Sequence, residues 1–158
     1  VLAASKIPTL EGLETLKEYG VRGIDHLAYG GADLGLLNKL DDFHRRKVET
    51  NISNYKILKE GVELLKNGTD IDEKLGELIY AHHKNLRDGL GISTPTIEKI
   101  LDCALAHGAY GGKINGSGGG GCCFVYAPKD RAEEIIAAAG ELGYPGKVLV
   151  QDTGIRVD

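Results

Sequence analysis

One stretch of the sequence combines residues that could bind an anion. Residues 116–121 read Gly-Ser-Gly-Gly-Gly-Gly and lie between two short runs typical of strands, residues 109–115 and 122–127. Glycine lacks a Cβ atom and adopts positive φ at little cost, so Gly118 to Gly121 can turn successive backbone N–H groups toward one point. A phosphate group is the natural ligand of such a main-chain cradle.

A second interpretation is structural: the glycines form a hairpin connection or let another backbone approach closely. Hairpins need only two or three such residues, and each further glycine costs about 1 kcal/mol of conformational free energy relative to alanine. A flexible linker is a poor match, because the run Cys-Cys-Phe-Val-Tyr that follows is typical of a buried strand. We therefore carry both the cradle and the close-packing interpretations forward.

Two common phosphate-binding motifs do not describe this loop. No Gly-Lys-Ser/Thr sequence ends it, and the residues that follow it predict a strand. Both the Walker A loop and the dinucleotide-binding fingerprint open a helix instead.

Composition narrows the class of protein. The 158 residues are 42% hydrophobic and 27% charged, which is typical of one soluble globular domain, and the net charge of −4 comes without a basic patch interleaved with aromatic residues. We expect no nucleic-acid partner. The sequence has no apolar run of about 18 residues and no signal peptide, so we expect a cytoplasmic protein with no membrane partner. The odd number of cysteines and their spacing predict buried free thiols rather than a disulfide framework or a zinc site.

Helices are predicted to dominate the first two thirds of the chain. Hydrophobic periodicity and capping residues predict four of them: 10–19 capped by Thr9, one long helix over 35–66, a helix that opens with the capping-box pair Asp70 and Glu73 and ends near Gly89, and 95–107 capped by Thr94. Residues 21–27 are ambiguous and could form a short strand.

Strands and one more helix are predicted to complete the chain. Residues 109–115 and 122–127 predict an antiparallel pair, Asp130 and Glu133 predict a capping box for a helix reaching Leu142, and 147–151 predict a last strand. The order β-β-α-β after the helices predicts an α+β sandwich, formed by residues 1–158 as one domain. The glycine loop would then lie at an end of the sheet, open to a ligand.

Other residues that could do chemistry have simpler interpretations. His82 falls on the apolar stripe of its helix and is expected to be a core histidine, and we expect no metal site. Arg87 and Asp88 are expected to pair locally at the end of that helix. Tyr110 is expected to pack beneath the loop rather than to line a sugar site.

The loop and much of the preceding sequence resemble the GHMP kinases, the family of galactokinase, mevalonate kinase and homoserine kinase. The loop resembles the third conserved motif of the family. The sequences His-Lys-Asn-Leu-Arg-Asp at 83–88, Ser-Thr-Pro-Thr-Ile at 93–97 and Ala-Leu-Ala-His-Gly-Ala-Tyr-Gly-Gly-Lys at 104–113 are similar to the galactokinase branch. Residues 45–48 loosely resemble the basic segment that opens that branch's long helix, with Asn51 in place of an expected Glu. The loop lacks the aromatic residue of galactokinases and is more similar to the mevalonate and heptose kinase forms.

The resemblance implies a ferredoxin-like C-terminal domain of an ATP-dependent kinase that phosphorylates a sugar hydroxyl. Its ATP, Mg²⁺ and sugar would be shared with an N-terminal half that is absent here and that carries the main phosphate loop and the acidic residue facing the acceptor. The chain starts at Val1 and contains no Met; removal of an initiator Met and excision from a longer protein explain this equally well. The residues carried over as lining near the phosphates are Gly116, Ser117, Gly118, Gly119 and Gly120, where Ser117 could donate its hydroxyl; no catalytic residue and no metal ligand is expected in this chain.

Three hypotheses follow. The first is the C-terminal domain of a galactokinase-like kinase, with a mevalonate- or heptose-kinase-like enzyme as its variant. The second is a stand-alone module that binds a phosphorylated ligand without catalysis. In the third, the glycines serve close packing alone.

Overall fold

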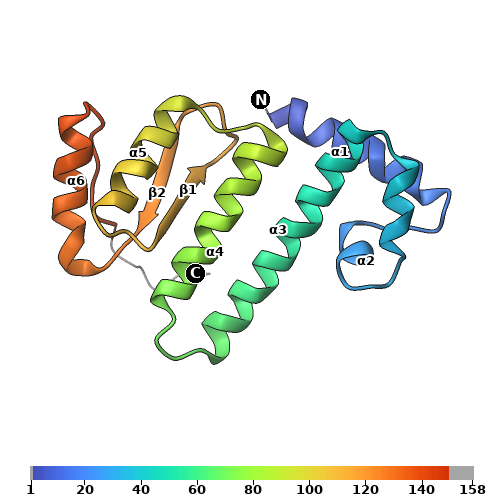
Figure 1. The fold of residues 1–158 in the computed structure, drawn as a ribbon, viewed down its shortest axis with the longest axis horizontal. Coiled ribbons are helices and arrows are strands. Elements are labelled where there is room, and N and C mark those ends of the chain that lie inside the picture. The colour runs from blue at the N-terminus through green and yellow to red at the C-terminus, as the bar shows by residue number, and fades with distance from the viewer. Residues whose placement is uncertain (1, 150–158) are drawn as a thin grey trace, which may run out of the picture.

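The computed structural model describes residues 2–149, which form helices at both ends of the molecule and one β-hairpin (Figure 1). The α-helices are α1 (Leu2–Lys17), α2 (Ile24–Ala28), α3 (Asp42–Asn67), α4 (Asp72–Lys84), α5 (Pro95–Ala106) and α6 (Ala132–Glu141). The strands are β1 (Gly111–Asn115) and β2 (Cys122–Tyr126). Short 3₁₀ segments are η1 (Leu34–Lys39) and η3 (Lys129–Arg131), and η2 (Asn85–Leu90) is a π-helical extension of α4.

The N-terminal helices form one hydrophobic core around α3. Leu16 and Val48 are completely buried there, and Leu27 from α2 is 1% exposed. One expectation for this region was wrong, and one ambiguous segment is resolved. Thr9 does not cap a helix, because α1 begins seven residues earlier and the Thr9 hydroxyl donates to the Ser5 carbonyl instead. Residues 24–28 form the short helix α2 and not a strand.

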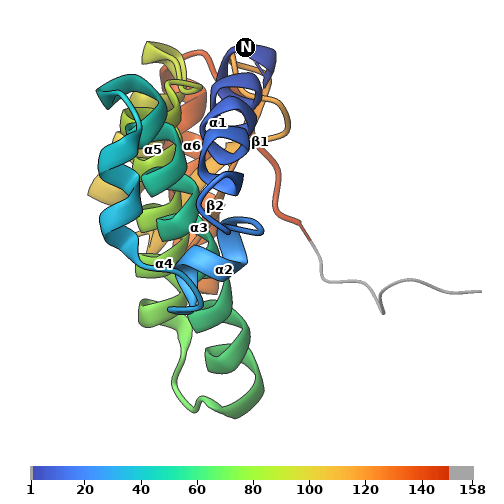
Figure 2. The same ribbon diagram turned by 90° about the vertical axis from the view of Figure 1, so that its right-hand side faces the viewer.

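The predicted long helix over 35–66 is divided in two. The chain becomes extended at Leu40 and Asp41, after η1. The Asp41 carboxylate then accepts a hydrogen bond of 2.9 Å from the backbone N–H of His44 and so begins α3. α3 and α4 run side by side along the molecule, as the two orthogonal views show (Figure 2).

Hydrogen bonds to backbone carbonyl groups join α3 to η2. The Lys47 ammonium group donates to the carbonyl oxygens of Gly89 and Leu90 over 2.9 and 3.0 Å, and Arg46 donates to the carbonyl oxygen of Asp88. Gly89 permits this approach, since a Cβ atom there would lie 2.1 Å from the Thr50 hydroxyl oxygen. The donors compensate carbonyl groups that the end of a helix leaves without partners.

The hairpin and α5 form a second core. β1 and β2 pair antiparallel with Lys113 opposite Phe124, and α5 packs on the hairpin while α4 lies along β1 (Figure 1). Leu101 of α5 and Ile114 of β1 are each 1% exposed in this cluster. The helical segment with an antiparallel sheet confirms the expected α+β class. Residues 147–149 form no strand, and the rest of the strand expected over 147–151 lies outside the described residues.

One of the expected caps on the later helices is confirmed, and two are wrong. Thr94 caps α5, with Pro95 at its first position. Asp70 adopts a left-handed conformation with φ of 51°, so α4 begins only at Asp72, without a side-chain cap. The Asp130 carboxylate caps nothing, because the 3₁₀ turn η3 precedes α6 and α6 begins without a side-chain cap. Among residues 2–149, no helix has the length and apolar character needed to span a membrane.

Candidate functional site

The glycine loop lies at the tip of the hairpin and adopts a conformation that favours glycine. The φ angles of Gly116, Gly118, Gly119 and Gly120 are 79°, 80°, 78° and 94°. Residues with a side chain rarely adopt these left-handed backbone angles, so the glycines allow the chain to turn here at low cost. Ser117 between them is exposed.

The loop rests on residues 92–94, which we call the supporting segment. Gly119 donates its backbone N–H to the Ile92 carbonyl oxygen over 2.9 Å. A Cβ atom on Gly118 would lie 2.7 Å from Ile92 Cβ, and one on Gly120 would lie 3.4 Å from Thr94 Oγ1. The glycines therefore also serve close packing, and the Gly119 N–H is engaged by protein. Within the described residues, the N–H groups of the other loop residues make no backbone hydrogen bond.

The beginning of α5 lies next to the loop and adds a favourable electrostatic environment for an anion. Thr94, which contacts the loop at Gly120, accepts a hydrogen bond of 3.4 Å from the Ile97 N–H. The aligned peptide dipoles of a helix give its N-terminal end a partial positive charge. The loop and this helix end together form a surface suited to phosphate oxygens.

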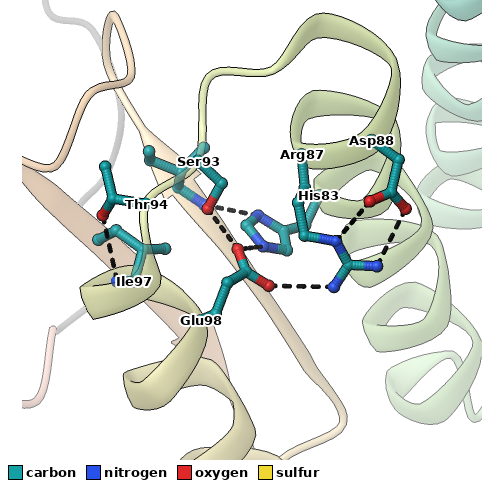
Figure 3. Close-up of polar contacts among 8 residues, drawn as sticks. His83, Arg87, Asp88, Ser93, Thr94, Ile97 and Glu98 are labelled. Atoms are coloured by element: carbon teal, nitrogen blue, oxygen red, sulfur yellow. Dashed lines mark hydrogen bonds and ion pairs between the residues drawn. The ribbon is translucent and has the colours of Figure 1, made fainter.

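A partly buried hydrogen-bond network near the loop centres on Glu98, in the first turn of α5 (Figure 3). Its Oε1 atom accepts from His83 Nε2 at 2.9 Å and from the Ser93 hydroxyl. Its Oε2 atom accepts from Arg87 at 3.0 Å. Burial opposes ionisation of Glu98, but the donors from Ser93, Arg87 and His83 outweigh it and lower the pKa of the carboxyl group.

His83, and not His82, is the core histidine. The His83 side chain is completely buried, and its Nδ1 atom accepts the backbone N–H of Ile114 over 3.2 Å. Because Nδ1 is an acceptor, the proton of a neutral ring lies on Nε2, where it is donated to Glu98. His82 is half-buried, and burial together with the nearby Lys113 charge lowers its pKa to about 4.

Arg87 and Asp88 pair locally, as expected. The guanidinium group donates from Nε and from a terminal nitrogen to the two carboxylate oxygens of Asp88, over 2.7 and 3.0 Å. This pairing lowers the pKa of Asp88 and, with Glu98, raises that of Arg87. The third contact of Arg87, to Glu98, ties the pair to the network.

The remaining expected residues lie apart from the loop. Tyr110 does not pack beneath it; it precedes β1 at the opposite end of the hairpin, with its ring 5.8 Å from that of Tyr126. The three cysteines are free thiols, as expected, but the prediction that they are buried was wrong, since Cys122 is exposed and Cys103 and Cys123 are only partly buried. Residues 2–149 contain no cluster of three acidic, histidine or cysteine side chains suited to a metal ion. The roles of Ser93 and Glu98 were not foreseen, since Ser93 lies in the turn before α5 and Glu98 does not interrupt the apolar pattern of that helix.

The sequence of this chain is similar to those of known kinases. Residues 69–145, which include the loop, the supporting segment and the network, match the family model described as "GHMP kinases C terminal". The mevalonate kinase of Thermococcus onnurineus is 33% identical over 110 residues, which are 68% of this chain and 33% of that protein. The galactokinases of Streptomyces coelicolor and Haemophilus influenzae are 30% and 33% identical over 129 residues, which are 77% of this chain. The chain spans about a third of the length of these relatives.

The fold is also found in a solved galactokinase. The crystal structure of Lactococcus lactis galactokinase complexed with galactose superimposes with a TM-score of 0.74 at 20% identity, covering 88% of this chain and 37% of that one. The family match and the relatives lead to one assignment, with which the shared fold agrees: residues 69–145 of this chain are a C-terminal domain of the GHMP kinase family.

Proposed function

We propose that this chain is the C-terminal domain of a galactokinase-like enzyme that transfers the γ-phosphate of ATP to a sugar hydroxyl. The observation that carries the proposal is the family match over residues 69–145, within which the glycine loop lies beside the N-terminal end of α5. Phosphoryl transfer depends on alignment and on stabilisation of charge more than on covalent chemistry. Fixed backbone dipoles in this loop would supply both.

Within the proposal, the residues near the phosphates are Gly116, Ser117, Gly118, Gly119 and Gly120. The N–H groups of Ser117, Gly118 and Gly120 and the Ser117 hydroxyl would donate to phosphate oxygens. Gly119 would act differently, since its N–H is bonded to Ile92; it would anchor the loop. The described residues offer no acidic cluster for Mg²⁺, so Mg²⁺ would reach the site with ATP and with residues outside this chain.

The remainder of the enzyme belongs to the proposal as well. An N-terminal half would supply the acidic residue that faces the acceptor and would share ATP and sugar with residues 1–158, which would form a single domain. We place such an enzyme in the cytoplasm. A mevalonate-kinase-like activity is the second candidate, and it is supported by the 33% identity to the Thermococcus onnurineus enzyme, which equals the identity to the Haemophilus influenzae galactokinase.

The test uses the native gene product that contains this chain. ADP release would be measured with ATP and Mg²⁺ and with galactose, a heptose or mevalonate as acceptor. We expect ADP release with galactose. Turnover with mevalonate or the heptose alone would establish the corresponding variant, and ATP binding without turnover on any acceptor would establish a binding module.

The role of the loop is tested in the same assay with Ser117→Ala. Loss of a hydrogen bond to a charged phosphate should raise the KM for ATP about tenfold or more. Thr15→Ala is the matched control, because it also removes an exposed hydroxyl that is far from the loop in sequence and belongs to α1. An unchanged KM in Ser117→Ala would remove Ser117 from the site.

A further inference from the structure

Glu98 links two segments that hold the glycine loop, although it does not itself belong to the loop. Its Oε1 atom accepts one hydrogen bond from His83 and another from Ser93 (Figure 3). His83 comes from α4, Ser93 precedes α5, and Glu98 lies within α5. One carboxylate oxygen is therefore shared by donors from separate parts of the chain.

The first connection leads through His83 to the strand that enters the loop. While Nε2 of His83 donates to Glu98, Nδ1 accepts the N–H of Ile114. Ile114 is two residues before Gly116, where the loop begins. In the neutral ring a single proton, on Nε2, sets the direction of both bonds. By accepting from Nε2, Glu98 selects the tautomer of His83 whose Nδ1 atom can accept the Ile114 N–H.

The second connection leads through Ser93 to the supporting segment. Ser93 lies between Ile92, which accepts the Gly119 N–H, and Thr94, which Gly120 approaches. A hydroxyl bond to Glu98 fixes the middle of that segment. The strand before the loop and the supporting segment are thus both connected to Oε1 of Glu98.

The other carboxylate oxygen of Glu98, Oε2, also accepts a hydrogen bond. Oε2 accepts from Arg87, which also donates one hydrogen bond to each carboxylate oxygen of Asp88. The side chain of Glu98 is 23% exposed, and the arginine compensates its charge. The carboxylate therefore has donors on both oxygens and one orientation.

We propose that Glu98, acting through His83 and Ser93, is a positioning residue that sets the glycine loop in its ligand-binding conformation. Nothing in this role requires Glu98 to touch the ligand. The inference rests on the proposed function only for the identity of that ligand, which we take to be the phosphates of ATP. The position of the loop itself can be measured without any activity.

The test compares amide hydrogen exchange in the 158-residue chain and its variants. Ser93→Ala removes only the connection to the supporting segment. Glu98→Gln weakens both connections, because a neutral amide oxygen is a weaker acceptor than a carboxylate oxygen and the amide NH₂ group cannot accept from Arg87. Glu134→Gln is the matched control, since Glu134 pairs with Arg131 at 2.9 Å on α6. We expect the Gly119 amide to exchange about three- to tenfold faster in Ser93→Ala and in Glu98→Gln, and the Ile114 amide to do so in Glu98→Gln only.

The pattern of exchange separates positioning from general stability. The proposal is supported if exchange becomes faster only at Gly119 and Ile114, while the other amides of β1 exchange as in the parent. The denaturation midpoint of Ser93→Ala should then also be close to that of the parent. Unchanged exchange at Gly119, or equal acceleration throughout β1, β2 and α5, overturns it. If Glu98→Gln does not fold, Ser93→Ala alone decides.

Activity in the native gene product provides a second readout. Ser93→Ala should raise the KM for ATP about three- to tenfold with kcat for the acceptor less affected, whereas Glu134→Gln should change neither. An unchanged KM together with unchanged Gly119 exchange contradicts the positioning role. A parent protein that turns over no acceptor contradicts the proposed function instead, and the exchange experiment still decides the role of Glu98.

Discussion

The backbone N–H of Gly119 donates to the carbonyl oxygen of Ile92 over 2.9 Å, which fastens the tip of the hairpin to the segment that precedes α5. The cradle and close-packing interpretations of the glycine run are consequently not exclusive. Gly119 contributes an anchor, while its neighbours keep N–H groups that make no backbone bond among the described residues.

Gly118→Ala should destabilise the chain by about 1–3 kcal/mol, because its φ is 80° and the new Cβ would lie 2.7 Å from Ile92 Cβ and 2.8 Å from the Ile92 carbonyl oxygen. Gly121→Ala is the control, since Gly121 lies outside the left-handed region and nothing lies within 4 Å of its Cβ position. Urea denaturation measures both. Equal midpoints for the two variants would contradict the close contact with Ile92.

His83→Leu should cost about 3 kcal/mol of unfolding free energy. The substitution keeps an apolar volume but leaves the Ile114 N–H without its acceptor in the interior and removes one of the two donors to Glu98 Oε1. His82→Leu, at the adjacent half-buried position, should change stability by less than about 1 kcal/mol. The same denaturation experiment decides between them, and a larger loss for His82→Leu would reverse the assignment of the core histidine.

His44 should make the chain more stable in mildly acidic than in basic solution. Its Nδ1 lies 2.6 Å from Asp41 and its Nε2 3.3 Å from Glu11, and these hydrogen bonds raise its pKa above 6.5. A raised pKa means that the stabilisation is fully present below pH 6.5 and is lost as the pH rises through the folded-state value. Denaturation midpoints of the parent and His44→Gln should therefore converge between pH 6 and about 9. A difference that grows with pH would contradict the ion pair.

His82 should show the opposite dependence. Its pKa in the folded chain is about 4, because burial and then Lys113 disfavour the charged ring. Its contribution to stability is present above pH 6.5 and is lost as the pH falls toward 4. An NMR titration of the ring protons checks this directly: the His82 midpoint should lie well below that of His44, and a midpoint near 6.5 would show that the ring is solvated.

The sequence predicted the later part of the fold better than the earlier part, for physical reasons that particular residues show. Thr94 and Pro95 begin α5 because capping is a local interaction, readable over four residues. α3 begins after Asp41 because the carboxylate of this residue caps it. The cap was missed because the apolar pattern of the sequence continues across Asp41. Asp70 and Glu73 have the spacing of a capping box, but the turn after α3 places Asp70 in a left-handed conformation.

The core histidine was assigned one position too early for a related reason. α4 approaches β1 so closely that a Cβ atom on Gly111 would lie 2.0 Å from the Gly76 carbonyl oxygen. The face of α4 in that contact is marked by Gly76 and His83, which lie two turns apart and are not large apolar residues. Counting apolar side chains therefore could not identify it. The glycine loop was recognisable from its composition, whereas Ser93 and Glu98 become linked only when α4, α5 and β1 pack together.

The contact between α3 and η2 has a consequence for which substitutions the chain can accept over time. Lys47 and Arg46 bind the carbonyl oxygens of residues 88–90, which every amino acid carries, and not their side chains. Sequence drift at Leu90 would leave these donors with the same acceptors, while a change at Lys47 would remove two bonds at once. On η2, Leu90 can therefore change without loss of these bonds, whereas Gly89, which leaves room for Thr50, and Asn85, which donates to α3, cannot.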